Sequence, residues 1–274
     1  MTEVWGSSRG HRPDGVRASG EEETRRQTPG TPCWTSLLVH DLEATQEFYG
    51  ELFGWSYYSP GPRQLGPYVR ATIEGHDVAG LGELPPDRKL SNSWTTYLAS
   101  DDADASAEWI RCSGGTVGVG PLAAEDAGRL VLAADPAGAP FGVWQGQKLM
   151  GPQLTGVPGT PVWHELVTHD ASVVVKFYRA LFEYEMKPMD EVDTDSLMLH
   201  LDGRPVAAVR GVGTRLRHPH WMTHFEVADA DAAAKRVAAL GGRVVGAPED
   251  TAAGRIVTVA DPEGALFTLR RSAR

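Results

Sequence analysis

The segment PGTPVWHELVTHD at residues 158–170 holds three side chains that can bind metals or transfer protons, namely His164, Glu165 and His169. Imidazoles and carboxylates are the usual groups of general acid–base catalysis and of divalent metal sites. Residues 29–41 read PGTPCWTSLLVHD, so the frame recurs but the His-Glu pair does not. The pair is therefore not required by the repeated pattern. A metal site, a catalytic pair and the polar lining of a pocket all remain open.

The repetition extends over most of the chain. HDLEATQEFYGELFGW at 40–55 returns as HDASVVVKFYRALFEY at 169–184, and DPAGAPFGVW at 135–144 returns as DPEGALFTLR at 261–270. A stretch rich in Gly and Pro at 145–159 separates the two copies, and such a composition is typical of a linker. The sequence therefore predicts a tandem repeat at the scale of whole domains.

A chain of 274 residues is long enough for two domains of about 100–150 residues each. We predict one domain at 29–145, a linker at 146–157 and a second domain at 158–274. Residues 1–28 are rich in Gly, Ser, Glu and Arg and hold too few apolar residues to offset the entropy of ordering. We expect them to form a disordered tail.

Composition narrows the class of protein. The chain is 41% hydrophobic and 23% charged, with a formal net charge of −10. No apolar run approaches the roughly 20 residues of a membrane span, and no cluster of Lys and Arg predicts binding to phosphates. We expect neither membrane nor nucleic acid as a partner. The two cysteines, Cys33 and Cys112, form no CxxC pair, which favours a reducing cytoplasm.

Each copy is predicted to alternate strands and helices, which gives an α+β fold. Trp163–His169 alternates like a strand, and Asp170 is suited to cap a helix that presents Phe177, Tyr178 and Phe182 on one face. Further segments follow in the same copy. They are a hairpin with an Asp-Gly turn at 202–203, a strand at 221–227, a helix at 230–240 that begins after Asp229 and ends at Gly241-Gly242, and a hairpin that turns at DPEG.

The FY-x₂-LF helix, the Gly-Gly pair and the DP-x-G turn, in that order and twice, resemble the vicinal oxygen chelate superfamily. This superfamily includes glyoxalase I, extradiol dioxygenases and bleomycin-resistance proteins, and the resemblance covers residues 30–271. It implies paired βαβββ modules whose curved sheet surrounds a cup, with helices on the opposite face. It leaves the activity open, because fold does not fix function.

Alternation along each strand predicts which side chains line the cups. In the second copy Leu197, Leu199 and Leu201 form an apolar row under the helices, so their neighbours face the cup. By this rule His164 faces away from it. We expect ligand contacts in the second cup from Trp163, Met198, His200, Met222 and Thr268, and in the first cup from Trp34, Arg70, Tyr97 and Trp144.

The resemblance also implies where a metal would be held. The positions that match the family's ligands hold Trp163, Met222 and Thr268 in the second domain and Trp34, Thr95 and Gly142 in the first. These residues do not form a His/Glu ligand set, so we expect no metal and no other cofactor. An alternative is a displaced site for Fe, Zn, Ni or Mn, built from Glu165, His200 and His224.

Three residues of the second copy have no counterpart in the first, where Ser36, Tyr97 and Ala99 stand instead. They are Glu165, His224 and Glu226. If they do chemistry, His224 is the general acid or base, held by either carboxylate, which would raise the pKa of the imidazole.

Two hypotheses about a small-molecule site follow, beside a third in which the chain is a regulatory or interaction protein and both domains are structural. The first is a metal-independent protein that binds a bulky aromatic or hydrophobic metabolite, in antibiotic resistance or in the biosynthesis of a secondary metabolite. The alternative is a lyase, isomerase or dioxygenase of the same superfamily, which uses the displaced metal or the His224-carboxylate pair. A small molecule is the expected partner in both, and the chain is expected to be a monomer or a homodimer.

Overall fold

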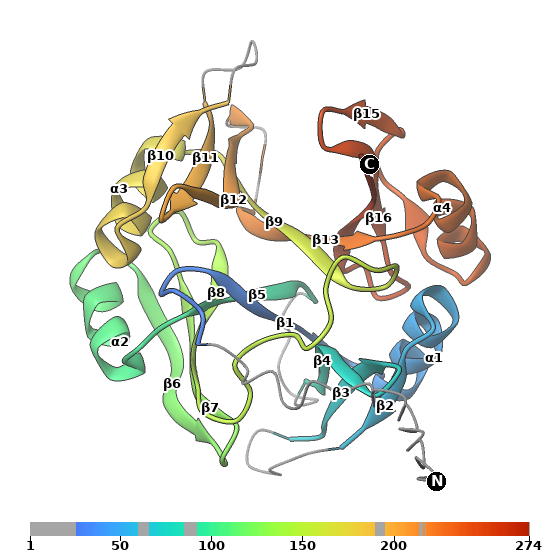
Figure 1. Cartoon of the computed structure of the whole chain (residues 1–274), viewed down its shortest axis with the longest axis horizontal. Coiled ribbons are helices and arrows are strands. Elements are labelled where there is room, and N and C mark those ends of the chain that lie inside the picture. The colour runs from blue at the N-terminus through green and yellow to red at the C-terminus, as the bar shows by residue number, and fades with distance from the viewer. Residues whose placement is uncertain are drawn as a thin grey trace, which may run out of the picture.

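The computed structural model describes residues 26–59, 66–84, 92–189, 195–213, 216 and 218–273. The described residues form two mixed β-sheets, each built from one copy of the repeat (Figure 1). Sheet A contains β1 (Pro32–Val39), β2 (Ser56–Tyr58), β3 (Tyr68–Ile73), β4 (His76–Glu83), β5 (Trp94–Ala99), β6 (Thr116–Ala124), β7 (Gly128–Ala134) and β8 (Pro140–Gly146). Sheet B contains β9 (Pro161–Thr168), β10 (Glu185–Pro188), β11 (Ser196–Leu201), β12 (Arg204–Gly211), β13 (His220–Glu226), β14 (Arg243–Val244), β15 (Glu249–Thr251), β16 (Gly254–Ala260) and β17 (Leu266–Ser272).

The two sheets share one strand order. Sheet A runs β2-β3-β4-β1-β5-β8-β7-β6, and sheet B runs β10-β11-β12-β9-β13-β17-β16-β14, with β15 paired to β16. In each sheet two modules meet at a central antiparallel pair, β1 with β5 and β9 with β13. The predicted α+β fold of paired modules is confirmed. The predicted boundaries near residues 145 and 158 stay a prediction.

The helices begin where the sequence places their caps. They are α1 (Leu42–Phe53), α2 (Ala103–Cys112), α3 (Ala171–Phe182) and α4 (Ala230–Ala239). Asp170 accepts a hydrogen bond from the Val173 amide, and Asp229 accepts one from the Ala232 amide. These bonds satisfy amides that a helix start leaves without partners, so both predicted caps are confirmed.

The helices and the faces of both sheets that they cover form the core. Helices α1 and α4 lie side by side at one end of the molecule, and α2 and α3 lie at the other (Figure 1). A matching pair of hydrogen bonds is among those that cross between the halves. The Tyr49 hydroxyl donates to Asp261 at 3.0 Å, and the Tyr178 hydroxyl donates to Asp135 at 3.3 Å. The copies therefore interlock through matching contacts.

A small polar cluster lies between the central strands of the two sheets. Thr96 bonds the Nδ1 atom of His164 at 2.9 Å, and Thr223 bonds the Thr35 hydroxyl at 3.2 Å. His164 is buried, and this desolvation lowers its pKa to about 3. His164 thus faces the other sheet, as strand alternation predicts. It is a packing residue rather than part of the opposite face.

This packing defines the two outward faces. The residues next to His164 and Thr223 along their strands point away from the other sheet. We call the resulting surface of sheet B, marked by Trp163, Glu165, Met198, Met222, His224 and Thr268, the C-terminal cup face. The corresponding surface of sheet A, marked by Trp34, Ser36, Tyr68, Tyr97 and Trp144, is the N-terminal cup face. The predicted alternation of these strands is confirmed.

Candidate functional site

The C-terminal cup face is built on three neighbouring strands in fixed register. On β9 and β13, Glu165 lies opposite Met222 and Trp163 lies opposite His224. On β13 and β17, His224 lies opposite Thr268. Met222, His224 and Thr268 are buried, whereas Trp163 is partly exposed. Met198 and His200 of β11 are partly exposed on the same face. The strands therefore bring all the predicted residues of the second cup onto one surface.

His224 is the most unusual side chain on this face. It is 7% exposed, and neither ring nitrogen has a hydrogen-bond partner among the described residues. Burial lowers its pKa to about 3, and the positive charge of Arg270 adds to this effect. The imidazole is therefore neutral at pH 7. It offers one donor and one acceptor, and no described protein group uses either of them.

The expected carboxylate partners of His224 are engaged elsewhere. Glu165 Oε2 accepts a hydrogen bond from Arg210 Nε at 3.0 Å and forms an ion pair with Arg210 Nη2, also at 3.0 Å. Glu226 accepts from the Ser272 amide at 3.0 Å and from the Ser272 hydroxyl at 2.6 Å. The prediction that a carboxylate holds His224 and raises its pKa is therefore wrong. The register of β12 on β9 brings Arg210 close enough to compete for Glu165.

Strand alternation also places Arg270 of β17 in the cup lining, but two residues of this face were missed in the sequence. Arg210 lies near the end of β12, and His220 is the first residue of β13. His220 Nδ1 lies 2.9 Å from the carbonyl of His218, and its Nε2 is buried without a described partner. Extending the alternation of β13 by two positions from Met222 would have placed His220 on the cup face.

The residues at the family's metal positions offer few metal donors. Trp163 and Met222 contribute an indole and a thioether, and Thr268 contributes a hydroxyl. Divalent iron, zinc and manganese prefer imidazole and carboxylate ligands. Among the residues that the structure describes, no three His, Cys, Asp or Glu side chains gather as a metal set. This donor set does not fit the metal of the family's enzymes.

The N-terminal cup face is occupied by its own side chains. Trp34 donates to the Tyr68 hydroxyl at 3.1 Å, and Trp144 donates to the Leu149 carbonyl of the following segment at 2.6 Å. Tyr97 bonds Ser36 at 3.1 Å. Trp34, Tyr97 and Trp144 are each at most 8% exposed. These predicted ligand contacts therefore pack and bond within the protein.

Glycines beneath the rings permit this packing. A methyl group at Gly80 would overlap the Tyr68 ring, and one at Gly142 would overlap the Tyr97 ring. Arg70, also predicted to contact a ligand, forms an ion pair with Asp77 at 2.9 Å. The polar groups of this face are thus largely satisfied within the chain, unlike His224 in the other half.

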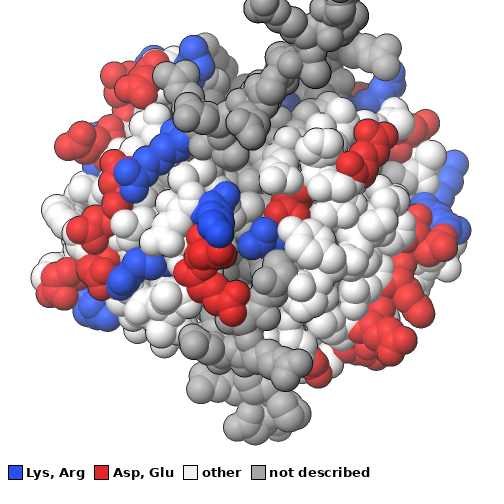
Figure 2. All heavy atoms as spheres, turned by 60° about the horizontal axis from the view of Figure 1, so that its bottom comes forward, with Lys and Arg blue, Asp and Glu red and all other residues white. Residues whose placement is uncertain are grey.

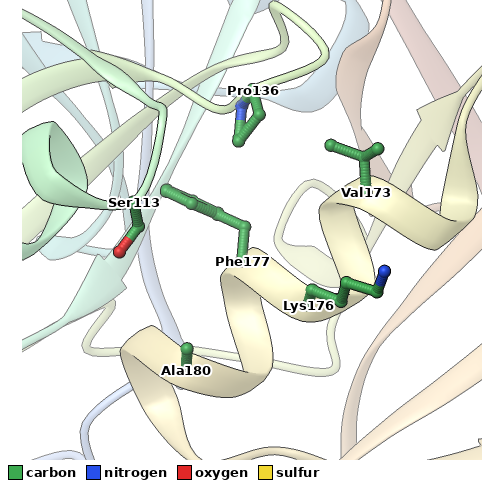
Figure 3. Close-up of a pocket in the computed structure, with 6 residues that line it drawn as sticks. All are labelled: Ser113, Pro136, Val173, Lys176, Phe177 and Ala180. Carbon is green, nitrogen blue, oxygen red and sulfur yellow. The ribbon is translucent and has the colours of Figure 1, made fainter.

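Two further surfaces carry no comparable set of groups. A hollow of about 340 Å³ lies between α3, the end of α2 and the turn at Pro136 (Figure 3). Its lining is mostly apolar, and Lys176 is its one charged lining residue. On the side turned forward in Figure 2, basic and acidic side chains are interspersed with uncharged surface. Within the described part of the chain, no helix is both long and apolar enough to cross a membrane.

The fold, with two paired modules in each sheet, is that of a glyoxalase-like protein. The glyoxalase-like domain family matches residues 163–270. The chain is 34% identical over 254 residues to CFP32 of Mycobacterium bovis, which carries a provisional glyoxylase name, and the match covers 89% of this chain and 95% of that protein. It is 34% identical over 258 residues to the anthracycline biosynthesis protein DauV of Streptomyces sp. strain C5, covering 89% and 94%. The chain belongs to the vicinal oxygen chelate superfamily.

Solved structures share the architecture at lower identity. The 2,3-dioxygenase LapB of Pseudomonas sp. KL28 has a TM-score of 0.62 at 13% identity, covering 90% of this chain and 94% of its own. A Mn(II)-bound glyoxalase of Novosphingobium aromaticivorans has a TM-score of 0.61 at 17% identity, covering 88% and 82%. These similarities show the fold. The predicted superfamily is confirmed by the relatives at 34% identity, and one structural neighbour is bound to Mn(II).

Proposed function

We propose that this chain binds a flat aromatic or bulky hydrophobic metabolite on the C-terminal cup face, without a metal ion. The observation that carries the proposal is His224, a buried imidazole with no described partner for either nitrogen. Buried polar groups in folded proteins nearly always have hydrogen-bond partners. His224 lies on the face that this fold uses for ligands. Its lack of described hydrogen-bond partners therefore supports a bound molecule that supplies them.

The remainder of this face suits an apolar body. Trp163, Met198 and Met222 present an indole and two thioethers around His224. Aromatic faces stack on flat rings, and thioethers adapt to irregular apolar shapes. A few polar groups among such a lining fix the orientation of a ligand. Thr268 and His200 are placed to serve this role beside His224.

Charge supports binding without a metal. The carboxylate of Glu165 is neutralised by Arg210, and the charges of Arg270 and Arg210 both lower the pKa of His224. A divalent cation beside His224 would be repelled by the guanidinium of Arg270, which no described carboxylate contacts. The donor set and the local charge therefore both favour an organic ligand over a cation.

The relatives suggest a biological setting. DauV and DnrV, both 34% identical to this chain, are named as anthracycline biosynthesis proteins. We therefore place the proposed ligand among secondary metabolites, with a role in their biosynthesis or in resistance to them. The packed N-terminal cup face supports a single ligand site in each chain.

A second candidate function is acid–base catalysis on the bound molecule. It is favoured by the same neutral imidazole, which is free to accept a proton from a ligand. Its low basicity favours ligands whose proton is already acidic. Catalysis predicts turnover that His224→Gln abolishes while binding persists. The displaced-metal version has less support, because Glu165 is held by Arg210.

Calorimetric titration with 1,4-dihydroxyanthraquinone, with EDTA present throughout, tests the proposal. We expect one molecule bound per chain, with an unchanged Kd when EDTA is left out. Trp163→Ala should weaken binding at least tenfold, which is about 1.4 kcal/mol. Trp109→Ala is the matched control, since Trp109 is 47% exposed on α2. Binding that EDTA removes, or equal binding by all three proteins, would contradict the proposal.

A further inference from the structure

The two ends of β13 on the C-terminal cup face differ in charge. His220 and His224 lie on the same face, four residues apart, with Met222 between them. At a strand rise of about 3.3 Å per residue, they are roughly 13 Å apart along the strand. Each has a buried ring nitrogen without a described partner. An elongated molecule that lies along β13 would reach both.

The end at His220 is electrically balanced. Burial lowers the pKa of His220, and the positive charge of Arg210 adds to this effect. The guanidinium of Arg210 is ion-paired with Glu165, whose carboxylate is largely buried. An ion pair with this geometry leaves little charge to attract another ion. This end can therefore donate or accept hydrogen bonds but selects weakly for ligand charge.

The end at His224 has a cation without a contacting anion. Arg270 is half-buried on the cup side of β17, two residues beyond Thr268, and its charge acts on His224. Its described hydrogen bond runs from Nε to the Ala253 carbonyl at 3.2 Å. Within the described ranges, no carboxylate lies within 4 Å of its guanidinium nitrogens.

Glu226 is the acid nearest in register to Arg270, directly opposite it on β13. Both of its carboxylate oxygens accept bonds from Ser272, so the carboxylate is directed to the end of β17. Its charge attracts Arg270 at a distance without satisfying the guanidinium donors. A guanidinium with unused donors beside a buried imidazole is suited to bind a carboxylate or a similar oxyanion.

We propose that the ligand is an acid, with its anionic oxygen group bound between Arg270 and His224 and its flat body lying along β13 over Met222 toward His220. This inference rests on the proposed function, since it specifies the chemistry of the same ligand. The arginine supplies the charge, and the neutral imidazole donates or accepts one hydrogen bond. The orientation follows from the balanced charge at the other end.

Titration with two isosteric probes tests this inference. The probes are anthraquinone-2-carboxylate and anthraquinone-2-carboxamide, which share a body and differ in charge. Wild-type protein should bind the carboxylate at least tenfold more tightly. Arg270→Gln should abolish this preference, because it should weaken binding of the carboxylate more than binding of the amide, and Arg270→Lys should retain part of the preference. Glu226→Gln should strengthen binding of the carboxylate, because it removes an opposing charge.

Arg271→Gln is the matched control, since Arg271 is the exposed neighbour of Arg270 on the same strand. It removes the same formal charge and should leave the preference intact. Equal affinity of the two probes in the wild type, or a preference that Arg270→Gln leaves intact, would overturn the inference while the proposed function stands. Failure of both probes to bind would contradict the proposed function and the inference together.

Discussion

At the scale of single residues, two histidines show how environment assigns a role. His164 and His224 come from adjacent, paired strands but point to opposite sides of sheet B. His164 is bonded by threonines between the sheets, whereas His224 has no described partner. Both are buried and neutral. The satisfied imidazole stabilises the fold, and the unsatisfied one costs stability that binding of a ligand would recover.

Substituting each histidine by leucine should therefore have opposite effects. His224→Leu removes unpaired buried polar atoms and should raise the free energy of unfolding by about 1–3 kcal/mol while it weakens ligand binding. His164→Leu leaves the Thr96 hydroxyl without its partner and should lower the free energy of unfolding by a similar amount. Urea unfolding measures both. Destabilisation of similar size at the two positions would show that His224 is satisfied within the protein.

The same contrast predicts a dependence on pH. The folded pKa of His224 is about 3 and its ordinary value is 6.5, so the unfolded chain takes up a proton first as the pH falls. Protonation of His224 in the unfolded chain therefore lowers the free energy of unfolding as the pH falls from 6.5 to 3. The stability gain of His224→Leu over wild type should grow by about 2 kcal/mol between pH 7.5 and 5. A gain that stays constant would contradict the burial of a neutral imidazole.

At the scale of elements, a hairpin turn in each half is hydrogen-bonded to a helix of the other half. Asp135 accepts bonds from the Ala137 and Ala139 amides of its own turn and from Tyr178 of α3. Burial raises its pKa to about 6 in spite of these bonds. An acid with a raised folded pKa binds its proton more tightly in the folded state. Stability therefore falls as pH rises from 3.8 through 6.

Asp135→Asn should remove this loss. The amide oxygen can keep both backbone bonds of the turn, and no charge is buried. At pH 7.5 we expect the variant to be at least as stable as wild type, by up to roughly 3 kcal/mol. Asp135→Leu, which loses the turn bonds, should be less stable at every pH. The comparison requires thermal or urea unfolding at pH 5 and 7.5, and a large loss of stability in Asp135→Asn would refute the account.

Elements and faces could be predicted from the sequence, whereas pairings between side chains could not. The alternation of Leu197, Leu199 and Leu201 placed Met198 and His200 on the cup face, as the structure has them. The partner of Glu165 depends on the parallel register of β12 on β9, which no local pattern specifies. His220 was missed because the strand predicted at 221–227 begins one residue too late, after the His-Pro-His segment at 218–220. The alternation of a strand can be read from neighbouring residues in the sequence. An ion pair between strands depends on how the folded strands align.

At the scale of the whole molecule, the repeat gives one chain two equivalent cup faces, and these faces differ in how their side chains are packed. The N-terminal cup face is packed with Trp34, Tyr68, Tyr97 and Trp144. On the C-terminal cup face, His220 and His224 have ring nitrogens with no partner among the residues that the structure describes. Each half contains both modules that build its sheet, so a single chain can form a complete site. Under the proposed function, the packed half supports the half that binds the ligand.

This difference between the two cup faces predicts that a substitution on the N-terminal cup face changes the free energy of unfolding but not the affinity for the ligand. Gly142→Ala places a methyl group where the Tyr97 ring lies and should cost about 1–3 kcal/mol of unfolding free energy through overpacking. The affinity of the folded variant for 1,4-dihydroxyanthraquinone should stay within twofold of wild type. Unfolding and calorimetric titration of the same preparation test this together. A loss of affinity without a loss of stability would place the ligand on the N-terminal cup face.

The central claim is that the C-terminal cup face binds one organic molecule without a metal ion. Native mass spectrometry of the untagged protein, mixed with anthraquinone-2-carboxylate in a chelator-containing volatile buffer, tests it most directly. The account predicts a complex of one chain and one probe molecule with no metal in its mass, and its loss in Trp163→Ala. A complex that forms only with an added divalent metal, and that disappears in His224→Ala, would contradict it.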